Sequence, residues 1–158
     1  MGVDIAEEIL EYVRCRLDMI IDHIGIVVSS LDKGIEKWRR LFGYDQLTEI
    51  TTNTRQKVNV VFLEKENSAI VKLIEPTDDS SPVFLFAKRS GGLHHLCFRT
   101  ENLDAEIARL ESESLRILAR PQPGEAFDNK NIAFVYAQDG LNIELIDTAR
   151  KANILFRK

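Results

Sequence analysis

The chain contains the segment Asp22-His23-Ile24-Gly25-Ile26-Val27-Val28-Ser29-Ser30-Leu31-Asp32 in two related copies. An offset of 72 residues lays it on His94-His95-Leu96-Cys97-Phe98-Arg99-Thr100-Glu101-Asn102-Leu103-Asp104, so that histidine meets histidine and Leu-Asp meets Leu-Asp. The same offset aligns Asn59-Val60-Val61-Phe62 with Asn131-Ile132-Ala133-Phe134, and Val71-Lys72-Leu73-Ile74-Glu75 with Ile143-Glu144-Leu145-Ile146-Asp147. One offset that holds at three separated places indicates a duplicated module.

Each copy has the pattern of a strand, a helix and further strands. In the first copy, alternation and β-branched residues predict strands at 20–28, 57–64 and 69–75, with a weaker one near 46–52. The helix between them is expected to begin at the capping residues Ser30 and Asp32 and to end at Gly43. In the second copy the corresponding expectations are strands at 93–100, 131–137 and 142–147, a helix at about 102–113, and a loop from Pro121 to Lys130.

These elements predict a single domain with two additions. Residues 1–19 are expected as a helical extension, and residues 149–158 as a basic C-terminal tail. The domain itself would span 20–148, with module one at 20–76, a linker at 77–92 and module two at 93–148. The linker contains Pro82 to Lys88, which is expected to form a short helix.

Composition excludes several classes of function. The net charge of the 158 residues is −4, so no overall positive field exists to attract nucleic acid. No apolar run reaches the length of a membrane span, and acids such as Asp4, Glu7 and Glu8 occupy the place of a signal-peptide core. Two cysteines cannot build a disulfide framework or a cysteine zinc site. We therefore expect a cytoplasmic protein that binds neither nucleic acid nor a membrane.

The alternation of strand side chains predicts which residues share a site. His23 and Lys72 in the first copy, and His95 and Glu144 in the second, fall on the strand face opposite the helix, whereas His94 is expected on the other face. If the modules curve toward each other, these four side chains converge across a pseudo-two-fold axis. Two imidazoles and one carboxylate are good ligands for a divalent metal. The competing interpretation is a metal-free protein in which Lys72 pairs with Glu144.

The sequence resembles the vicinal oxygen chelate superfamily, the glyoxalase, bleomycin resistance and extradiol dioxygenase group. Over residues 20–148 it is most similar to methylmalonyl-CoA epimerases. The resemblance rests on Ile21-Asp22-His23-Ile24-Gly25-Ile26-Val27-Val28, Leu73-Ile74-Glu75-Pro76, Ser81-Pro82, Gly91-Gly92-Leu93-His94-His95-Leu96-Cys97 and Ile143-Glu144-Leu145. It implies an α+β fold in which two tandem βαβββ modules form a curved mixed sheet, here with an extra N-terminal helix. A homodimer is expected as well.

Carried over by position, the resemblance makes His23, His95 and Glu144 the metal ligands. The ion would be cobalt, zinc, manganese, nickel or iron. Two departures from the family pattern stand out. Lys72 occupies the place of a further Gln or Glu ligand, and Asn59 lies on the strand where two-base epimerases carry a second acid.

The resemblance implies an epimerase or isomerase that acts on a 2-substituted acyl-CoA through a metal-stabilised enolate. Glu144 would serve one face of the substrate, and Lys72 is predicted as the other catalytic base, since burial beside a metal favours its neutral amine. Asn59, Cys97 and Asn131 are the expected substrate-binding residues.

Two alternatives stay open. The first is a non-haem metal dioxygenase or a lyase of the same superfamily, for which Tyr136 and Glu144 have a suitable spacing. The second is a small-molecule binding protein without catalysis, which Lys72 and Asn59 would favour.

Overall fold

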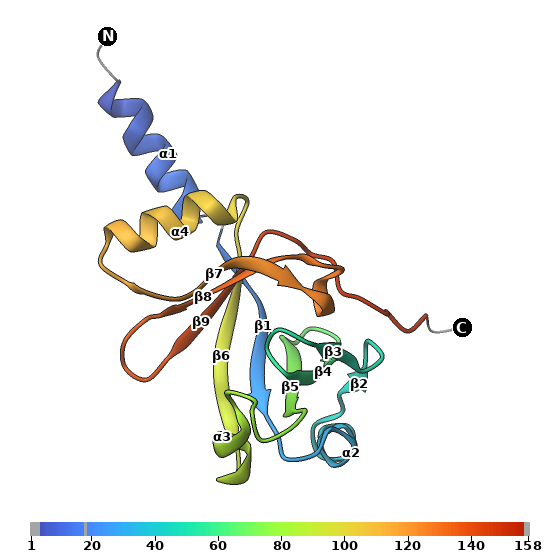
Figure 1. Ribbon diagram of the computed structural model, residues 1–158. Coiled ribbons are helices and arrows are strands. Elements are labelled where there is room, and N and C mark those ends of the chain that lie inside the picture. Colours follow the sequence, from blue (N-terminus) through green and yellow to red (C-terminus); the bar gives the residue numbers. More distant parts are fainter. Residues whose placement is uncertain (1–3, 18, 157–158) are drawn as a thin grey trace.

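The computed structural model describes residues 4–17 and 19–156 (Figure 1). Its elements are, in chain order, α1 (Ile5–Leu17), β1 (Ile20–Val27), α2 (Leu31–Phe42), β2 (Asp45–Gln46), β3 (Thr51–Asn53), β4 (Val58–Glu64), β5 (Ile70–Pro76), α3 (Phe84–Lys88), β6 (Gly92–Arg99), α4 (Leu103–Ser112), β7 (Arg116–Gly124), the 3₁₀ turn η1 (Glu125–Phe127), β8 (Lys130–Tyr136) and β9 (Asn142–Ile146). None of the helices in this described part of the chain is long and apolar enough to cross a membrane.

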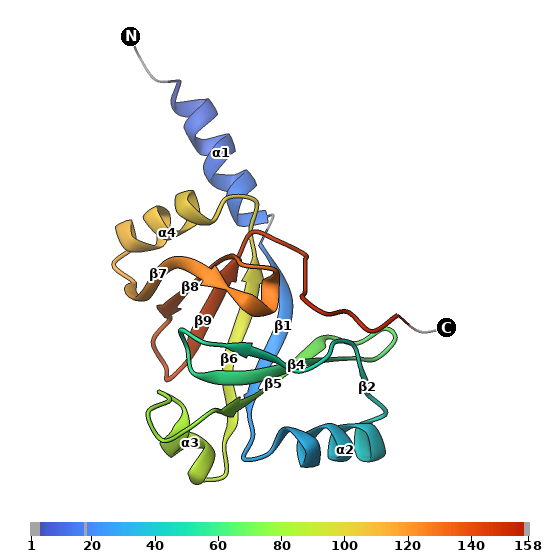
Figure 2. The same cartoon turned by 45° about the vertical axis from the view of Figure 1, so that its right-hand side comes forward.

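The strands form one curved sheet built from two equivalent halves. Its order is β2-β4-β5-β1-β6-β9-β8-β7, with β3 paired to β4. In the first half β5 lies parallel to β1 and antiparallel to β4. In the second half β9 lies parallel to β6 and antiparallel to β8. An antiparallel β1–β6 pair joins the halves, and Figure 2 shows α2 and α4 at opposite ends of the sheet. The expected α+β fold of two tandem βαβββ modules is therefore confirmed.

The two long helices begin in the same way. Ser30 caps α2 by accepting a hydrogen bond from the backbone N–H of Lys33, and Asn102 caps α4 by accepting one from Ala105. α2 ends at Gly43, whose φ of 69° lies in the left-handed region. Each helix covers one half of the sheet with its own apolar cluster. The opposite face of both halves is thereby left to form the site.

One strand lies where a loop was expected. β7 (Arg116–Gly124) includes Pro121 and Pro123, and it pairs with β8 at the edge of the sheet through an irregular register. Proline lacks the N–H that an interior strand must donate, but an edge strand can tolerate it. The loop prediction for Pro121–Lys130 was therefore wrong over its first part, because the prolines mark an edge and not a break.

The C-terminal segment is bound to both modules. Ala152 donates its backbone N–H to Ala126 in module two, whereas Leu155 donates to Leu47 in module one. Lys151 and Ala152 are buried. This strap, residues 151–155, crosses from one half of the molecule to the other. α1 by contrast projects away from the body (Figures 1 and 2), and Ile5, Ile9, Leu10 and Val13 on it are exposed.

Candidate metal and acyl-binding site

Two β-bulges place polar residues beside the site. In the β1–β6 ladder Ile21 and His23 face consecutive residues of β6, so Asp22 is an extra residue on β1. Likewise Gly25 and Ile26 face His95 and Leu93, so His94 is an extra residue on β6. A bulge interrupts alternation and re-aims its side chain. The prediction that His94 points away from the site was therefore wrong: His94 lines the same cavity as His95.

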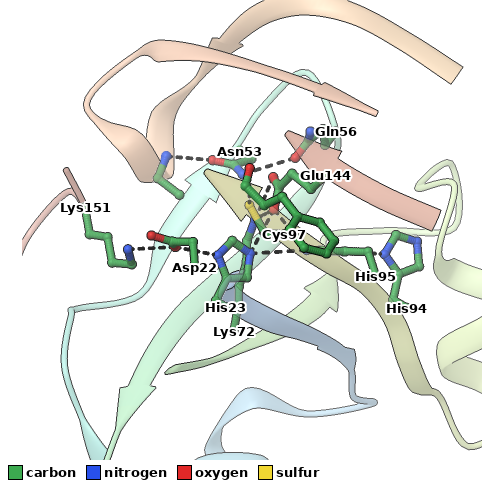
Figure 3. Close-up of polar contacts among 12 residues, drawn as sticks. Asp22, His23, Asn53, Gln56, Lys72, His94, His95, Cys97, Glu144 and Lys151 are labelled. Carbon is green, nitrogen blue, oxygen red and sulfur yellow. Dashed lines mark hydrogen bonds and ion pairs between the residues drawn. The ribbon is translucent and has the colours of Figure 1, made fainter. Parts of the chain in front are cut away.

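His23, His95 and Glu144 converge at the junction of the two modules (Figure 3). His23 Nε2 lies 2.8 Å and His95 Nε2 lies 2.9 Å from the same oxygen, Glu144 Oε2. The two Nε2 atoms are 3.2 Å apart. All three side chains are buried, and each lies on a central strand of the sheet, β1, β6 or β9.

Lys72 lies at the position of the expected fourth ligand, 72 residues before Glu144. Its Nζ donates to both carboxylate oxygens, at 3.2 Å to Oε1 and 3.3 Å to Oε2. The ammonium also lies 5.0 Å from the centre of the Phe127 ring, and Lys72 is only 1% exposed. Burial alone would raise the pKa of Glu144, but the Lys72 charge and the histidine hydrogen bonds hold it well below its usual range. The pairing that the metal-free interpretation requires is thus present.

Asp22 contacts His23 on Nδ1, the ring nitrogen that faces away from Glu144. Its Oδ1 lies 2.9 Å from His23 Nδ1 and 2.9 Å from Lys151 Nζ, so the strap reaches the site (Figure 3). Burial works to raise the pKa of Asp22, yet its hydrogen bond with His23 and the Lys151 charge bring it below the ordinary value. A carboxylate on the far nitrogen of a histidine fixes the tautomer and orientation that a metal ligand needs.

Gly25 makes room for the His95 ring. A Cβ at Gly25 would lie 2.2–2.6 Å from three atoms of that ring, closer than any real contact. Phe134 closes the other side, with its ring centre 5.6 Å from that of His95. Because the imidazole is almost completely buried, burial lowers the pKa of His95 to about 3. His95 is therefore neutral and available as a ligand.

A cavity of about 460 Å³ opens beside these residues and is lined by both modules. Lys72, His94 and His95 contribute its reactive polar groups, and Arg55 and Asn142 also line it. Most of the remaining wall is apolar, as is usual for small-molecule sites. No aspartate or glutamate of the described residues belongs to the lining, so Glu144 lies behind Lys72 and His95.

The three expected substrate-binding residues do not line this cavity. Asn59 accepts a hydrogen bond from Thr52 Oγ1, since it alternates with the cavity-facing Val58 and Val60. Asn131 is exposed at the start of β8. Cys97 is completely buried in the core, where burial raises the pKa of its thiol.

The three residues His23, His95 and Glu144, called the triad below, have the spacing of a metal site. A divalent first-row ion holds nitrogen and oxygen ligands at about 2.0–2.2 Å, which places neighbouring ligand atoms about 3 Å apart. His23 gives a second indication, because each of its nitrogens faces a carboxylate oxygen, at 2.9 Å on Asp22 and 2.8 Å on Glu144. A neutral imidazole has one N–H and can satisfy only one of them. A cation at Nε2 would satisfy the other, so these three residues fit a divalent ion, with Lys72 as the misfit in the fourth place.

The dioxygenase alternative gains nothing from the geometry. The Tyr136 hydroxyl accepts a hydrogen bond from the Gly140 N–H at 3.2 Å, and Tyr136 is not part of the cavity wall.

Comparison with known proteins agrees with this fold. A sequence model of the Glyoxalase/Bleomycin resistance protein/Dioxygenase superfamily matches residues 22–136. The chain is 29% identical over 129 residues to the mitochondrial methylmalonyl-CoA epimerase of Dictyostelium discoideum, covering 79% of this chain and 76% of that protein. It is 33% identical over 130 residues to the uncharacterized protein YqjC of Bacillus subtilis, covering 80% and 91%.

A similar solved structure is a variant of Streptomyces coelicolor methylmalonyl-CoA epimerase in complex with 2-nitronate-propionyl-CoA. Its TM-score is 0.69 and its identity 30%, with 82% of this chain and 96% of that chain covered.

Proposed function

Because this chain belongs to the glyoxalase, bleomycin resistance protein and dioxygenase superfamily, we propose that it is an acyl-CoA epimerase. The proposed substrate is a 2-substituted malonyl-type thioester such as methylmalonyl-CoA, and the reaction is removal and return of the proton at C2. The observation that carries the proposal is the convergence of His23, His95 and Glu144 within 3.2 Å beside a largely apolar cavity. The similarity to methylmalonyl-CoA epimerases supports the choice of substrate.

We assign the residues as follows. His23 Nε2, His95 Nε2 and Glu144 Oε2 would hold one divalent ion, which when bound supplies Lewis-acid stabilisation of negative charge on the substrate oxygens. Asp22 Oδ1 keeps His23 in the required orientation. Lys72 Nζ on the cavity wall would take up the C2 proton as the neutral amine and return it as the ammonium, and Glu144 holds Lys72 there through both oxygens.

Deuterium uptake at C2 tests the proposal. Methylmalonyl-CoA is incubated in heavy water with metal-loaded protein, and exchange is followed by proton NMR. Lys72→Ala should abolish exchange and still retain the ion. Lys65→Ala is the matched control and should exchange at the wild-type rate, because Lys65 is an exposed lysine that donates to the Phe42 carbonyl. Absence of exchange in the wild type with every tested ion would refute the epimerase; full activity of Lys72→Ala would refute the role of Lys72 alone.

A second candidate is a small-molecule binding protein without catalysis. It is favoured by the Lys72–Glu144 ion pair, which balances the buried carboxylate without any metal. Metal content by mass spectrometry, before and after chelation and reloading, separates the two. A protein that cannot be reloaded supports the binding module.

A further inference from the structure

His94 connects the metal ligands to the cavity. Its Nδ1 lies 2.8 Å from Nδ1 of His95, and its ring belongs to the cavity wall. Among the described residues no group is hydrogen-bonded to His94 Nε2, and this atom is not buried. The contact therefore occupies the Nδ1 edge of the His94 ring and leaves Nε2 without a protein partner, on a residue that lines the cavity.

The Nδ1–Nδ1 contact needs one proton. At 2.8 Å one nitrogen must donate and the other accept, and a neutral imidazole carries its single N–H on one nitrogen only. The nitrogen that carries the proton on His95 is decided at its other end, where Nε2 faces Glu144 Oε2 at 2.9 Å. The state of the triad thus fixes the tautomer of His95, and His95 in turn fixes that of His94.

The two states of the triad give opposite results. Without an ion, His95 donates from Nε2 to Glu144 and accepts at Nδ1, so His94 carries its proton on Nδ1 and offers Nε2 as an acceptor. With an ion on His95 Nε2, the His95 proton must lie on Nδ1. His94 then accepts at Nδ1 and carries its own proton on Nε2, which becomes a donor. No proton is gained or lost by either ring in this exchange.

We propose that filling the triad with a divalent ion converts His94 Nε2 from a hydrogen-bond acceptor to a donor directed at the cavity. Carboxylate and carbonyl oxygens are acceptors only, so the loaded protein would bind them at His94 and the empty protein would not. Given the proposed function, the matching group is a carboxylate or thioester oxygen of the acyl-CoA. His94 is then a residue that couples ion binding to substrate recognition.

Tautomer measurement by NMR tests this directly. Two-bond proton–nitrogen correlations distinguish the protonated from the unprotonated nitrogen of each imidazole, and this chain has only three histidines. Spectra of the full-length protein are recorded with a chelator and then with one equivalent of Zn²⁺, with His94→Gln to assign the signals. We expect the His94 proton to move from Nδ1 to Nε2 on addition of Zn²⁺. An unchanged His94 tautomer in Zn²⁺-bound protein overturns the inference, and so does a failure of Zn²⁺ to bind.

Substrate affinity provides a second readout. His94→Phe keeps a planar ring but cannot donate, so it should weaken binding of methylmalonyl-CoA to the Zn²⁺ form by about two- to tenfold and weaken binding to the chelated form by less. Equal loss in both forms would contradict the coupling. The outcomes are independent of catalysis: a tautomer change without deuterium exchange at C2 would refute the epimerase and leave this inference standing.

Discussion

Replacement of Lys72 by methionine removes a buried positive charge and keeps most of the side-chain volume. The structure pairs Lys72 Nζ with Glu144 Oε1 at 3.2 Å, and Glu144 has no exposed surface. In the variant the Glu144 carboxylate would retain its hydrogen bond from His95 Nε2 and lose its cation. We expect the chelated protein to be strongly destabilised.

The size of the effect follows from the distance. At 3.2 Å and an effective dielectric constant of 20, the attraction between the two charges is about 5 kcal/mol. Removal of one partner of a buried pair costs about 3–5 kcal/mol. For a domain of this size each kcal/mol lowers Tm by about 2–4 °C, so Tm should fall by about 6–20 °C.

Urea unfolding in a chelator measures the change for Lys72→Met and for the double variant Lys72→Met/Glu144→Gln. The double variant leaves no unpaired charge, so it should lose less stability than the single variant. Zn²⁺ should also restore part of the loss in Lys72→Met, because the ion supplies the missing positive charge. Glu144→Gln alone completes the comparison. The ion pair does not stabilise the protein as argued if Lys72→Met unfolds within about 1 kcal/mol of the wild type, or if the double variant loses the sum of both single changes.

Three further predictions concern other parts of the molecule. Gly25→Ala should displace the His95 ring and reduce Zn²⁺ affinity measured by calorimetry, because the new Cβ would lie 2.2–2.6 Å from the ring; Gly43→Ala, away from the site, should not change that affinity. The free energy of unfolding should fall as pH drops from 6.5 toward 3, by at most about 1.4 kcal/mol per pH unit. Burial lowers the pKa of His95 to about 3 in the folded protein, so over this range only the unfolded chain takes up a proton on His95. Urea titrations at several pH values should show this slope in chelated wild-type protein and a smaller one in His95→Gln; equal slopes would exclude His95 as the cause. The homodimer expected from the sequence, if it uses the exposed apolar residues of α1, should dissociate in Ile9→Glu, as seen by light scattering; a wild-type monomer, or an unaffected dimer, would rule out this contact.

The convergence of His23, His95 and Glu144 could be predicted from the sequence because strand alternation and the duplication act together. His23 and His95 are related by one offset, and the same offset brings Glu144 opposite Lys72. In the structure these four side chains do meet. Each lies inside a regular stretch of strand, where period two decides the face.

The bulge residues could not be placed by that rule. A bulge results from how two strands pair, and local sequence does not encode it. The only available signal was the repeat itself, because Asp22 and His94 are related by the same offset of 72 and both contact the following histidine. Asn59 was misjudged for a related reason: its strand was expected correctly, but Val58 and Val60 take the cavity face.

The strap has a consequence for the order in which the site can be assembled during synthesis. Lys151 is synthesised 129 residues after Asp22, whose carboxylate it contacts. When a ribosome has completed the first module, Asp22 and His23 are present but the cation that holds Asp22 in place has not been made. The nascent first module therefore carries an acid without its cationic neighbours Arg99 and Lys151, and the second of these arrives only when the strap closes over both halves.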